Sequence, residues 1–394
     1  MSNLIKFYLA TIFWTTVNMF TSGTVVQTFM MENGFSEQLT NTIFSCGQII
    51  TLTVMLLTSP VIDKIHNVIK ANMSTYLLYI PFILVLCAIC FYGSIPLFLV
   101  VLLCLTVAGY SVGSGLHCSL SYKVPYAIMD IRNYGRVTSV SGILTGIMGL
   151  LLSLLLTWMQ NTLGYRTAMT TIYLICLPLI IVVVLVSASM KALPNAPMPI
   201  KKETKSFNYL RFKPFTSLIA ANFLRGFGTG ILNVVVTIGY YCGCIDSNSA
   251  TILVIISNLT TFLGCGLYSI TTGKLSDKRI ILISALFISL SVPFMLVGNN
   301  TLVFLITYAI ATTFWTVINY AIPVAVVQIA DYSIMGQYSA GRMLLHIAGS
   351  SLAGVAAIPM IKFLGPLPTM LLTAGTFLFC GISYYIYMKK NKLR

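Results

Sequence analysis

Twelve long apolar runs divide this chain, and each is about as long as a membrane is thick. A helix that crosses a hydrocarbon core of roughly 30 Å needs about 20 apolar residues, whereas a membrane strand needs roughly 10 residues in strict alternation. The runs are continuous and lack that alternation, so we predict an all-α membrane protein with twelve transmembrane helices. They lie near residues 4–30, 37–62, 73–93, 96–121, 137–161, 167–190, 214–241, 247–273, 280–297, 301–329, 343–363 and 366–388.

The composition excludes a water-soluble protein. Hydrophobic residues make up 57% of the chain and charged residues 8%, against roughly 45 to 50% and roughly 25% in soluble domains. So few charges cannot cover a water-facing surface, which excludes a soluble enzyme, a nucleic-acid binder and a disordered chain. The formal net charge of +15 comes from cations between the apolar runs, so we expect their partner to be the lipid bilayer and not nucleic acid. The ten cysteines lie mostly inside apolar runs, and we expect no disulfide framework, metal site or cofactor.

The positions of the 23 Lys and Arg residues predict which side of the membrane each loop faces. Cations near the ends of spans are retained in the cytoplasm. If the amino terminus is cytoplasmic, only Arg166 and Lys362 face outward and Arg225 lies within the seventh run, which leaves 20 cations inside. We therefore expect a multi-pass protein of the plasma membrane with both termini in the cytoplasm. The first run is longer than a signal-peptide core, so we expect it to be retained.

The chain divides into two halves that share a register. A polar stretch with three prolines and six cations, residues 191–213, follows the sixth run. Asp63 follows the second run and Asp277 follows the eighth, 214 residues later, and the same shift moves the first run almost onto the seventh. We predict a six-helix bundle over 1–190, a cytoplasmic linker over 191–213 and a second six-helix bundle over 214–394.

Each half carries an acid followed by a base at the end of its second run. The segments are Ser59-Pro60-Val61-Ile62-Asp63-Lys64 and Gly273-Lys274-Leu275-Ser276-Asp277-Lys278-Arg279. The second segment has the glycine, and four residues later the Asp and Lys, of the loop motif of the major facilitator superfamily, whereas Ser59 replaces the glycine in the first. Together with the twelve runs and the shared register, these segments make the whole chain resemble that superfamily. The resemblance implies two parallel six-helix repeats with a substrate site between them near midmembrane, and a gating role for Asp63, Lys64, Gly273, Asp277 and Lys278.

A segment between the tenth and eleventh runs is similar to a loop of the glycoside, pentoside and hexuronide symporters within that superfamily. It runs Ala330-Asp331-Tyr332-Ser333-Ile334-Met335-Gly336-Gln337-Tyr338-Ser339-Ala340-Gly341-Arg342, and Val124-Pro125-Tyr126-Ala127 after the fourth run is similar to another segment of that branch. Gln337 stands where the branch has an acid, and the arginine comes one residue early. The resemblance implies that Asp331 and Arg342 take part in gating.

Polar residues gather in the first, fourth, seventh and tenth runs, which line the substrate cavity in the fold that the resemblance implies. A polar side chain in lipid is costly unless it has a partner, and a wet cavity removes that cost. Trp, Thr and Asn recur at the same spacing in Phe13-Trp14-Thr15-Thr16-Val17-Asn18 and Phe314-Trp315-Thr316-Val317-Ile318-Asn319. An aromatic face beside amides suits a polyhydroxylated solute, although simple packing between helices also explains the aromatic residues. The expected substrate-binding residues are Trp14, Asn18, Tyr110, Arg225, Asn233, Trp315, Asn319 and Tyr320.

Arg225 is the one charge deep inside a predicted span, because the eight Asp and Glu residues all lie outside the runs or, in the case of Glu37, at the first residue of one. An ionisable residue at that depth indicates a functional site. A guanidinium pairs best with a carboxylate or phosphate, so we expect a negatively charged solute such as a uronate or another organic anion, with a neutral sugar or glycoside as the alternative. Without a membrane acid, coupling would involve His117, His346, a bound coupling cation or an exchanged anion.

These patterns favour a secondary active transporter that moves a small-molecule substrate by alternating access and works as a monomer. Multidrug efflux is the alternative within that class, but the fifth run has glycines at positions 142, 146 and 149 without the Gly-Pro step of drug exporters. A membrane-embedded enzyme is the alternative of another class. It would need a catalytic or metal-binding constellation within the bilayer, and none is visible, so we do not expect an enzyme.

Overall fold

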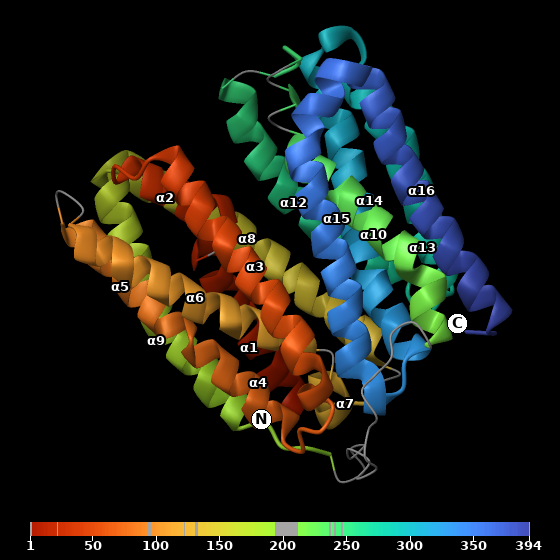
Figure 1. The fold of residues 1–394 in the computed structure, drawn as a ribbon, viewed down its shortest axis with the longest axis horizontal. Helices are drawn as coiled ribbons and strands as arrows, with labels where there is room; N and C mark the ends of the chain where they lie inside the picture. Colours follow the sequence, from red (N-terminus) through yellow and green to blue (C-terminus); the bar gives the residue numbers. More distant parts are fainter. Residues whose placement is uncertain are drawn as a thin grey trace. The chain divides into compact units, whose positions relative to one another are not determined.

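The structure is a computed structural model that describes residues 2–21, 23–92, 96–121, 123–130, 133–193, 212–235, 238–239, 242–245 and 247–393. In that part of the chain, all regular structure is helical apart from an isolated bridge between Thr272 and Leu275. The chain forms two compact units, Met1–Ile131 with Met148–Thr204 and Arg132–Ile147 with Lys205–Arg394. Figure 1 shows long helices bundled within each unit.

The first unit is built from the helices that precede the central basic stretch. They are α1 (Asn3–Thr21), α2 (Gly23–Glu32), α3 (Glu37–Ile62), α4 (Val68–Leu77), α5 (Tyr79–Phe91), α6 (Leu97–Leu120), the short α7 (Val124–Ile128), the second half of α8 (Tyr134–Leu163) and α9 (Tyr165–Ala188). Its main core lies between α1, α2, α5, α6 and α9, where residues such as Phe29, Phe82 and Tyr173 are fully buried.

The second unit contains the first half of α8 and every helix after the basic stretch. These helices are α10 (Lys213–Asn233), α12 (Ser247–Thr271), α13 (Asp277–Ser291), the 3-10 segment η2 (Val292–Asn299), α14 (Thr301–Ile329), the single turn η3 (Tyr332–Ile334), α15 (Met335–Leu364) and α16 (Pro366–Lys390). Helix α10 packs extensively against α15 and α16, and α13 packs against α14 and α16.

Polar caps and glycine turns interrupt the apolar helices. Ser36 Oγ accepts a hydrogen bond from the Leu39 amide at the start of α3, and Asn300 Oδ1 accepts from the first free amides of α14. Such side chains satisfy donors that a helix end leaves open. Gly164 and Gly365 have φ of +80° and +91° where α8 meets α9 and α15 meets α16. Only glycine adopts that backbone without strain, so the chain reverses direction there.

The helices agree with the predicted spans. Within the described residues, nine helices or stacked helix pairs are long and apolar enough to cross a membrane. Helix α14 covers the tenth predicted run from end to end, Thr301–Ile329. The first, seventh and eighth runs also contain helices, namely α1 with α2, α10, and α12. The central linker was predicted at 191–213, and its residues 194–211 lie outside the described part, so the linker remains a prediction.

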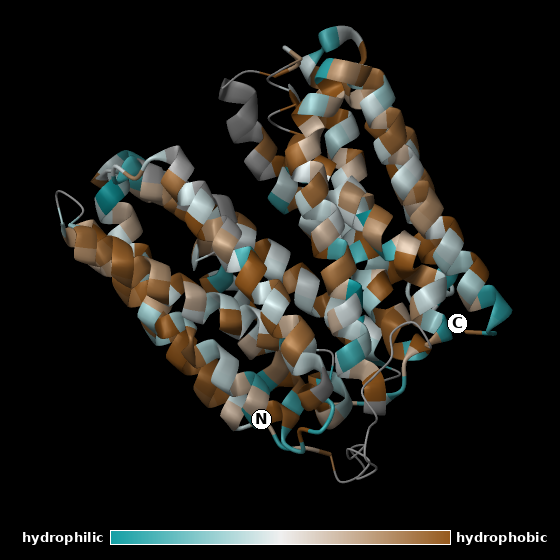
Figure 2. Ribbon diagram, in the orientation of Figure 1, coloured by the Kyte–Doolittle hydropathy of each residue, from teal (hydrophilic) through white to brown (hydrophobic). Residues whose placement is uncertain are grey.

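Large apolar side chains cover the outside of the bundles. Val355 is 80% exposed and Phe363 is 88% exposed, and many leucines on other helices are more than half exposed. Figure 2 shows hydrophobic residues along the helices of both units rather than on one face alone. Helices that are apolar all round suit a lipid environment. The chain is a multi-pass membrane protein.

The segment at Ala330–Arg342 was predicted as a loop, and this prediction is wrong for its second part. Helix α15 begins at Met335, eight residues before the predicted eleventh run, so Met335 to Arg342 form its first two turns. These residues are buried although several are polar. Tyr338 packs edge-on against Phe212 and Phe215 near the start of α10, with ring centroids 5.6 and 6.4 Å apart. The stretch from Met335 to Arg342 is therefore helical because it is buried against α10, although its polarity is typical of a loop.

The first half of α8 packs in the second unit rather than with the helices on either side of it in sequence. Two glycines allow this close approach. A Cβ at Gly142 would lie 2.5 Å from Cys265 Sγ and from the Tyr320 hydroxyl, and one at Gly146 would lie 3.0 Å from the Phe262 backbone. Small residues four apart let helix backbones come close in lipid. Helix α8 thus contributes residues to both units, and the predicted boundary of the first bundle at residue 190 stays a prediction.

Candidate functional site

Two hydrogen bonds join α10 to α14 inside the second unit. Arg225 is 5% exposed, and its Nη2 donates to Asn319 Oδ1 at 2.8 Å. One turn later in α10 and one turn earlier in α14, Trp315 Nε1 donates to Thr229 Oγ1 at 3.2 Å. The two bonds lie side by side because residues four apart share a helical face. Three predicted substrate-binding residues, Arg225, Trp315 and Asn319, therefore meet at one contact between helices.

Two other predicted residues of this unit lie elsewhere. Tyr320 faces α12, where its ring lies 6.5 Å from that of Tyr268. Asn233 is the last residue of α10, two turns beyond Arg225, and its side chain is exposed. The five predicted substrate-binding residues of the second unit therefore do not form a single cluster.

Arg225 shares its surroundings with His346 and Arg342, both from α15. Arg342 is 1% exposed. The charges of both arginines act on the His346 imidazole, whose Nδ1 has no hydrogen-bond partner among the described residues. A Cβ at Gly226 would lie 2.0 Å from the His346 carbonyl oxygen. Glycine at that position brings α10 and α15 into backbone contact, so the two helices that carry the arginines are closely packed.

An aromatic cluster occupies the corresponding part of the first unit. The Trp14 ring lies 4.6 Å from Tyr76, 4.6 Å from Tyr79 and 5.4 Å from His117, measured between centroids. Tyr110 extends the cluster, 4.7 Å from Tyr79. Trp14, Tyr110 and His117 remain partly exposed. Two predicted substrate-binding residues and one predicted coupling residue thus lie together, and Asn18 follows Trp14 by one turn of α1.

A chain of side-chain contacts orients His117. Its Nδ1 lies 2.9 Å from Asn72 Oδ1, and Asn72 Nδ2 donates to the Tyr76 hydroxyl at 3.2 Å. In this arrangement Nδ1 carries the hydrogen that the amide oxygen accepts, so the neutral imidazole presents Nε2 as an acceptor. Asn72, Tyr76 and Tyr79 were not predicted as site residues. Asn72 lies one residue before the predicted third run. An amide side chain so close to a span was the one sequence feature that indicated Asn72 as a site residue.

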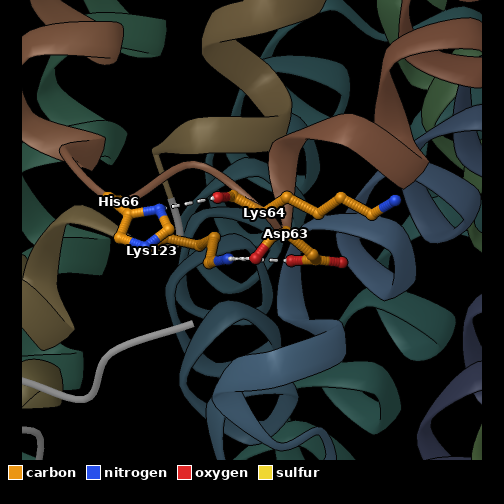
Figure 3. Close-up of polar contacts among 4 residues, drawn as sticks. All are labelled: Asp63, Lys64, His66 and Lys123. Carbon is orange, nitrogen blue, oxygen red and sulfur yellow. Dashed lines mark hydrogen bonds and ion pairs between the residues drawn. The ribbon is translucent and has the colours of Figure 1, made fainter. Parts of the chain in front are cut away.

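The first loop segment contains a buried ion pair (Figure 3). Asp63 follows the last residue of α3, and its Oδ1 lies 2.9 Å from Lys123 Nζ, at the start of α7. The same ammonium donates to the Asp63 carbonyl oxygen at 3.4 Å. Lys64 points into solvent, and its carbonyl oxygen lies 3.2 Å from His66 Nδ1. Asp63 therefore ties the end of α3 to the connection between α6 and α7.

The second loop segment uses neutral partners. Asp277 Oδ2 accepts from Gln328 Nε2 at 2.7 Å, and Oδ1 accepts from the Tyr268 hydroxyl at 3.3 Å. Lys278 Nζ donates to the Leu393 carbonyl oxygen at 2.7 Å. Asp277 thus links the start of α13 to the end of α14, while Gly273 makes the preceding turn at a φ of +87°. Asp331, by contrast, is exposed just before η3.

In the described part of the chain, no group of three or more His, Cys, Asp or Glu side chains is placed to hold a metal ion. The described site residues offer hydrogen-bonding amides, aromatic faces and guanidinium groups, which are suited to binding and releasing a solute.

The sequence matches no family model and no curated protein. Similar solved structures include the fucose:proton symporter FucP of E. coli, a major facilitator superfamily transporter, in an outward conformation (TM-score 0.76, 12% identity, 97% of this chain and 98% of that chain). A bacterial homologue of the iron transporter ferroportin, outward-facing with soaked iron, aligns at TM-score 0.75 and 10% identity over 98% of both chains. The human organic anion transporter MFSD10 aligns at TM-score 0.62 and 12% identity over 97% of both chains. The chain has the twelve-helix major facilitator fold, which confirms the predicted fold class.

Proposed function

We propose that this chain is a secondary transporter that carries a small organic anion across the plasma membrane by alternating access. The fold supports the transport class, because the similar solved structures carry the names of a sugar symporter, an iron transporter and an organic anion transporter. In such folds two repeats rock around a central site. We propose that the protein acts as a monomer with both termini in the cytoplasm, as the distribution of its cations favours.

The observation that carries the anion assignment is the positive charge buried among α10, α14, α15 and α16. These four helices bring Arg225 and Arg342 into the interior, and their sequences contain no Asp or Glu. A buried guanidinium raises the local potential strongly because the surroundings screen it poorly. A carboxylate or phosphate is the solute group that such a site binds best.

The neighbours of Arg225 suit the recognition of an organic anion. Asn319 holds one nitrogen of the guanidinium at 2.8 Å, which restricts its orientation. Thr229 similarly fixes the Trp315 indole one turn away. An indole face beside a guanidinium provides apolar contact for a carbon skeleton next to a charged group. We therefore assign Arg225 to the anionic group, and Asn319 and Trp315 to positioning and packing.

A neutral sugar is the second candidate solute, and the aromatic cluster of the first unit favours it. Trp14 and Tyr110 present partly exposed rings, and the contact with Asn72 leaves His117 Nε2 as an acceptor. Ring faces pack on the C–H patches of sugars while polar groups bond hydroxyls. Multidrug efflux is less favoured because charged and hydrogen-bonding groups are prominent at both sets of residues.

The loop residues and histidines keep their expected roles as proposals. Asp63 and Asp277 would hold helix ends during the transport cycle, with Gly273 shaping the second loop. Lys64 and Asp331 are exposed and would act through solvent or lipid headgroups. His117 and His346 are the candidate coupling groups, because none of the eight acids lies in the interior of a predicted span.

The test compares Arg225→Gln, Arg225→Lys and Arg166→Gln in purified protein. Ligands are first found by a thermal-shift screen against uronates, other organic anions, sugars, glycosides and cationic drugs. Arg225→Gln should then nearly abolish binding and proteoliposome uptake of the anion, and Arg225→Lys should weaken both because it loses the forked geometry. Arg166 is an exposed arginine of the first unit, so Arg166→Gln is the matched control. Normal uptake of a neutral sugar by Arg225→Gln, with no anion bound by the wild type, refutes the anion assignment.

A further inference from the structure

The first turns of α15 carry buried polar atoms that the fold leaves without partners. The Tyr338 hydroxyl and Ser339 Oγ are fully buried, and neither has a hydrogen-bond partner among the described residues. Buried hydroxyls in proteins are nearly always bonded to protein groups, ordered water or a ligand, because an unmade bond is costly. Two adjacent residues whose buried hydroxyls lack a hydrogen-bond partner indicate a place where a polar ligand can bind.

Arg342 lies beside these hydroxyls. Tyr338, Arg342 and His346 are spaced by four residues, so they lie along one face of α15. The Arg342 charge acts on both the Tyr338 hydroxyl and the His346 imidazole. Ser339 precedes Arg342 by three residues and therefore lies next to the same face. The Tyr338, Arg342 and His346 side chains thus share one face of α15, and Ser339 lies beside that face.

The surroundings favour a negatively charged occupant over water alone. Helices α10, α15 and α16 contain no acid, and Arg342 is a buried cation on the same face of α15 as Tyr338. The Tyr384 hydroxyl, from α16, is already engaged, since it donates to Asn222 Oδ1 at 2.8 Å. The Tyr338 and Ser339 hydroxyls can each donate a hydrogen bond to a ligand near this cation.

Close packing between α10 and α15 holds the backbone of α15 in place next to these side chains. A Cβ at Gly349 would lie 2.2 Å from the Phe223 carbonyl oxygen, and one at Gly230 would lie 2.4 Å from the Ser350 carbonyl oxygen. These contacts, with that at Gly226, fix α15 against α10 over more than two turns. A site between fixed helices requires little reorganisation when it binds an ion.

We propose that Tyr338, Ser339, Arg342 and His346 form a second anion site, which neighbours Arg225 but is built from side chains of α15, and that this site binds a small anion. The anion is either a free inorganic ion such as chloride or the carboxylate group of a solute on its way through the protein. All four side chains of this site belong to α15, so the site does not depend on the role proposed for Arg225.

The experiment measures the melting temperature of the purified full-length protein in sodium gluconate, with chloride, bromide, phosphate or acetate added at constant ionic strength. A bound anion stabilises the folded state by mass action. We expect a saturable rise of about 2 to 4 °C with at least one small anion. Chloride as the active ion identifies an inorganic ligand, and acetate without chloride identifies a carboxylate group. No rise with any of the four ions overturns the proposal.

Matched variants localise the effect. Tyr338→Phe and Ser339→Ala each remove one hydroxyl, and each should raise the half-saturating anion concentration about tenfold or more. Tyr173→Phe and Ser141→Ala remove buried hydroxyls that also have no described partner but lie elsewhere, and they should leave the anion response unchanged. Equal responses in all four variants overturn the site.

A further variant separates this inference from the proposed transport function. Arg225→Gln should lose organic anion uptake but keep the response of the melting temperature to the small anion. If Arg225→Gln abolishes that response while Tyr338→Phe and Ser339→Ala retain it, the ion binds at Arg225 and the second site does not exist.

Discussion

The Asp63 carboxylate and the Lys123 ammonium form an ion pair 2.9 Å long in which neither side chain is more than 1% exposed. Removing two charges from water is costly, and breaking such a pair leaves one charge buried without compensation. The pair joins the end of α3 to the start of α7. Its loss should therefore affect the folding stability of the protein as well as the movement of these helix ends during transport.

Lys123→Met should therefore lower the stability of the protein by about 3 to 5 kcal/mol. The double variant Lys123→Met with Asp63→Leu removes both charges and should recover much of that loss. Chemical unfolding of the purified protein measures both effects. Lys64→Met is the control, because Lys64 is the exposed neighbour. A Lys123→Met variant as stable as Lys64→Met would show that the pair contributes nothing to stability.

Asp277→Asn should slow transport strongly while ligand binding stays nearly intact. The substitution weakens the charge-assisted bonds from Gln328 and Tyr268, which are worth about 1.5 to 3 kcal/mol each, and so loosens the link between α13 and α14. Uptake into proteoliposomes and equilibrium binding separate the two effects. Glu32→Gln changes an exposed acid at the end of α2, to which no gating role is assigned, and should do little. Equal losses of uptake in both variants would contradict a special role for Asp277.

Gly226→Ala should disrupt the second unit. The added Cβ would lie 2.0 Å from the His346 carbonyl oxygen, and a backbone atom cannot rotate away as a side chain does. Overpacking costs about 1 to 3 kcal/mol and more when backbone must move. The melting temperature and the yield of folded protein report the loss. Gly354→Ala, on α15, adds a methyl group where nothing lies within 4 Å, so it should be neutral or slightly stabilising.

Labelling with a membrane-impermeant thiol reagent tests the orientation of the chain. A cysteine introduced at Asn299 should be labelled in intact cells above the background of the parent protein. One at Lys64 should be labelled only after the membrane is permeabilised. Both positions are exposed, so access to the thiol depends on the side of the membrane. Labelling of Lys64→Cys in intact cells would reverse the predicted topology.

The sequence alone determined the helical membrane class and most of the span positions. Lipid offers no hydrogen-bond partner to the backbone, so long apolar runs have few structures open to them, and the tenth run, 301–329, matches α14 residue for residue. Arg225 was identified for the same reason, because a charge inside such a run is rare.

Tertiary structure decided which residues meet. The sequence marked Arg225, Trp315 and Asn319 separately, but only the packing of α10 against α14 showed that Arg225 bonds Asn319. Asn72 reaches His117 and Lys123 reaches Asp63 across more than 40 residues of chain. Local patterns carry no information on such pairs, because helices that are apolar all round do not reveal which face turns toward a neighbour. Arg342 illustrates the same limit: its polar surroundings predicted a loop, and contact with the start of α10 placed it inside a helix and out of water.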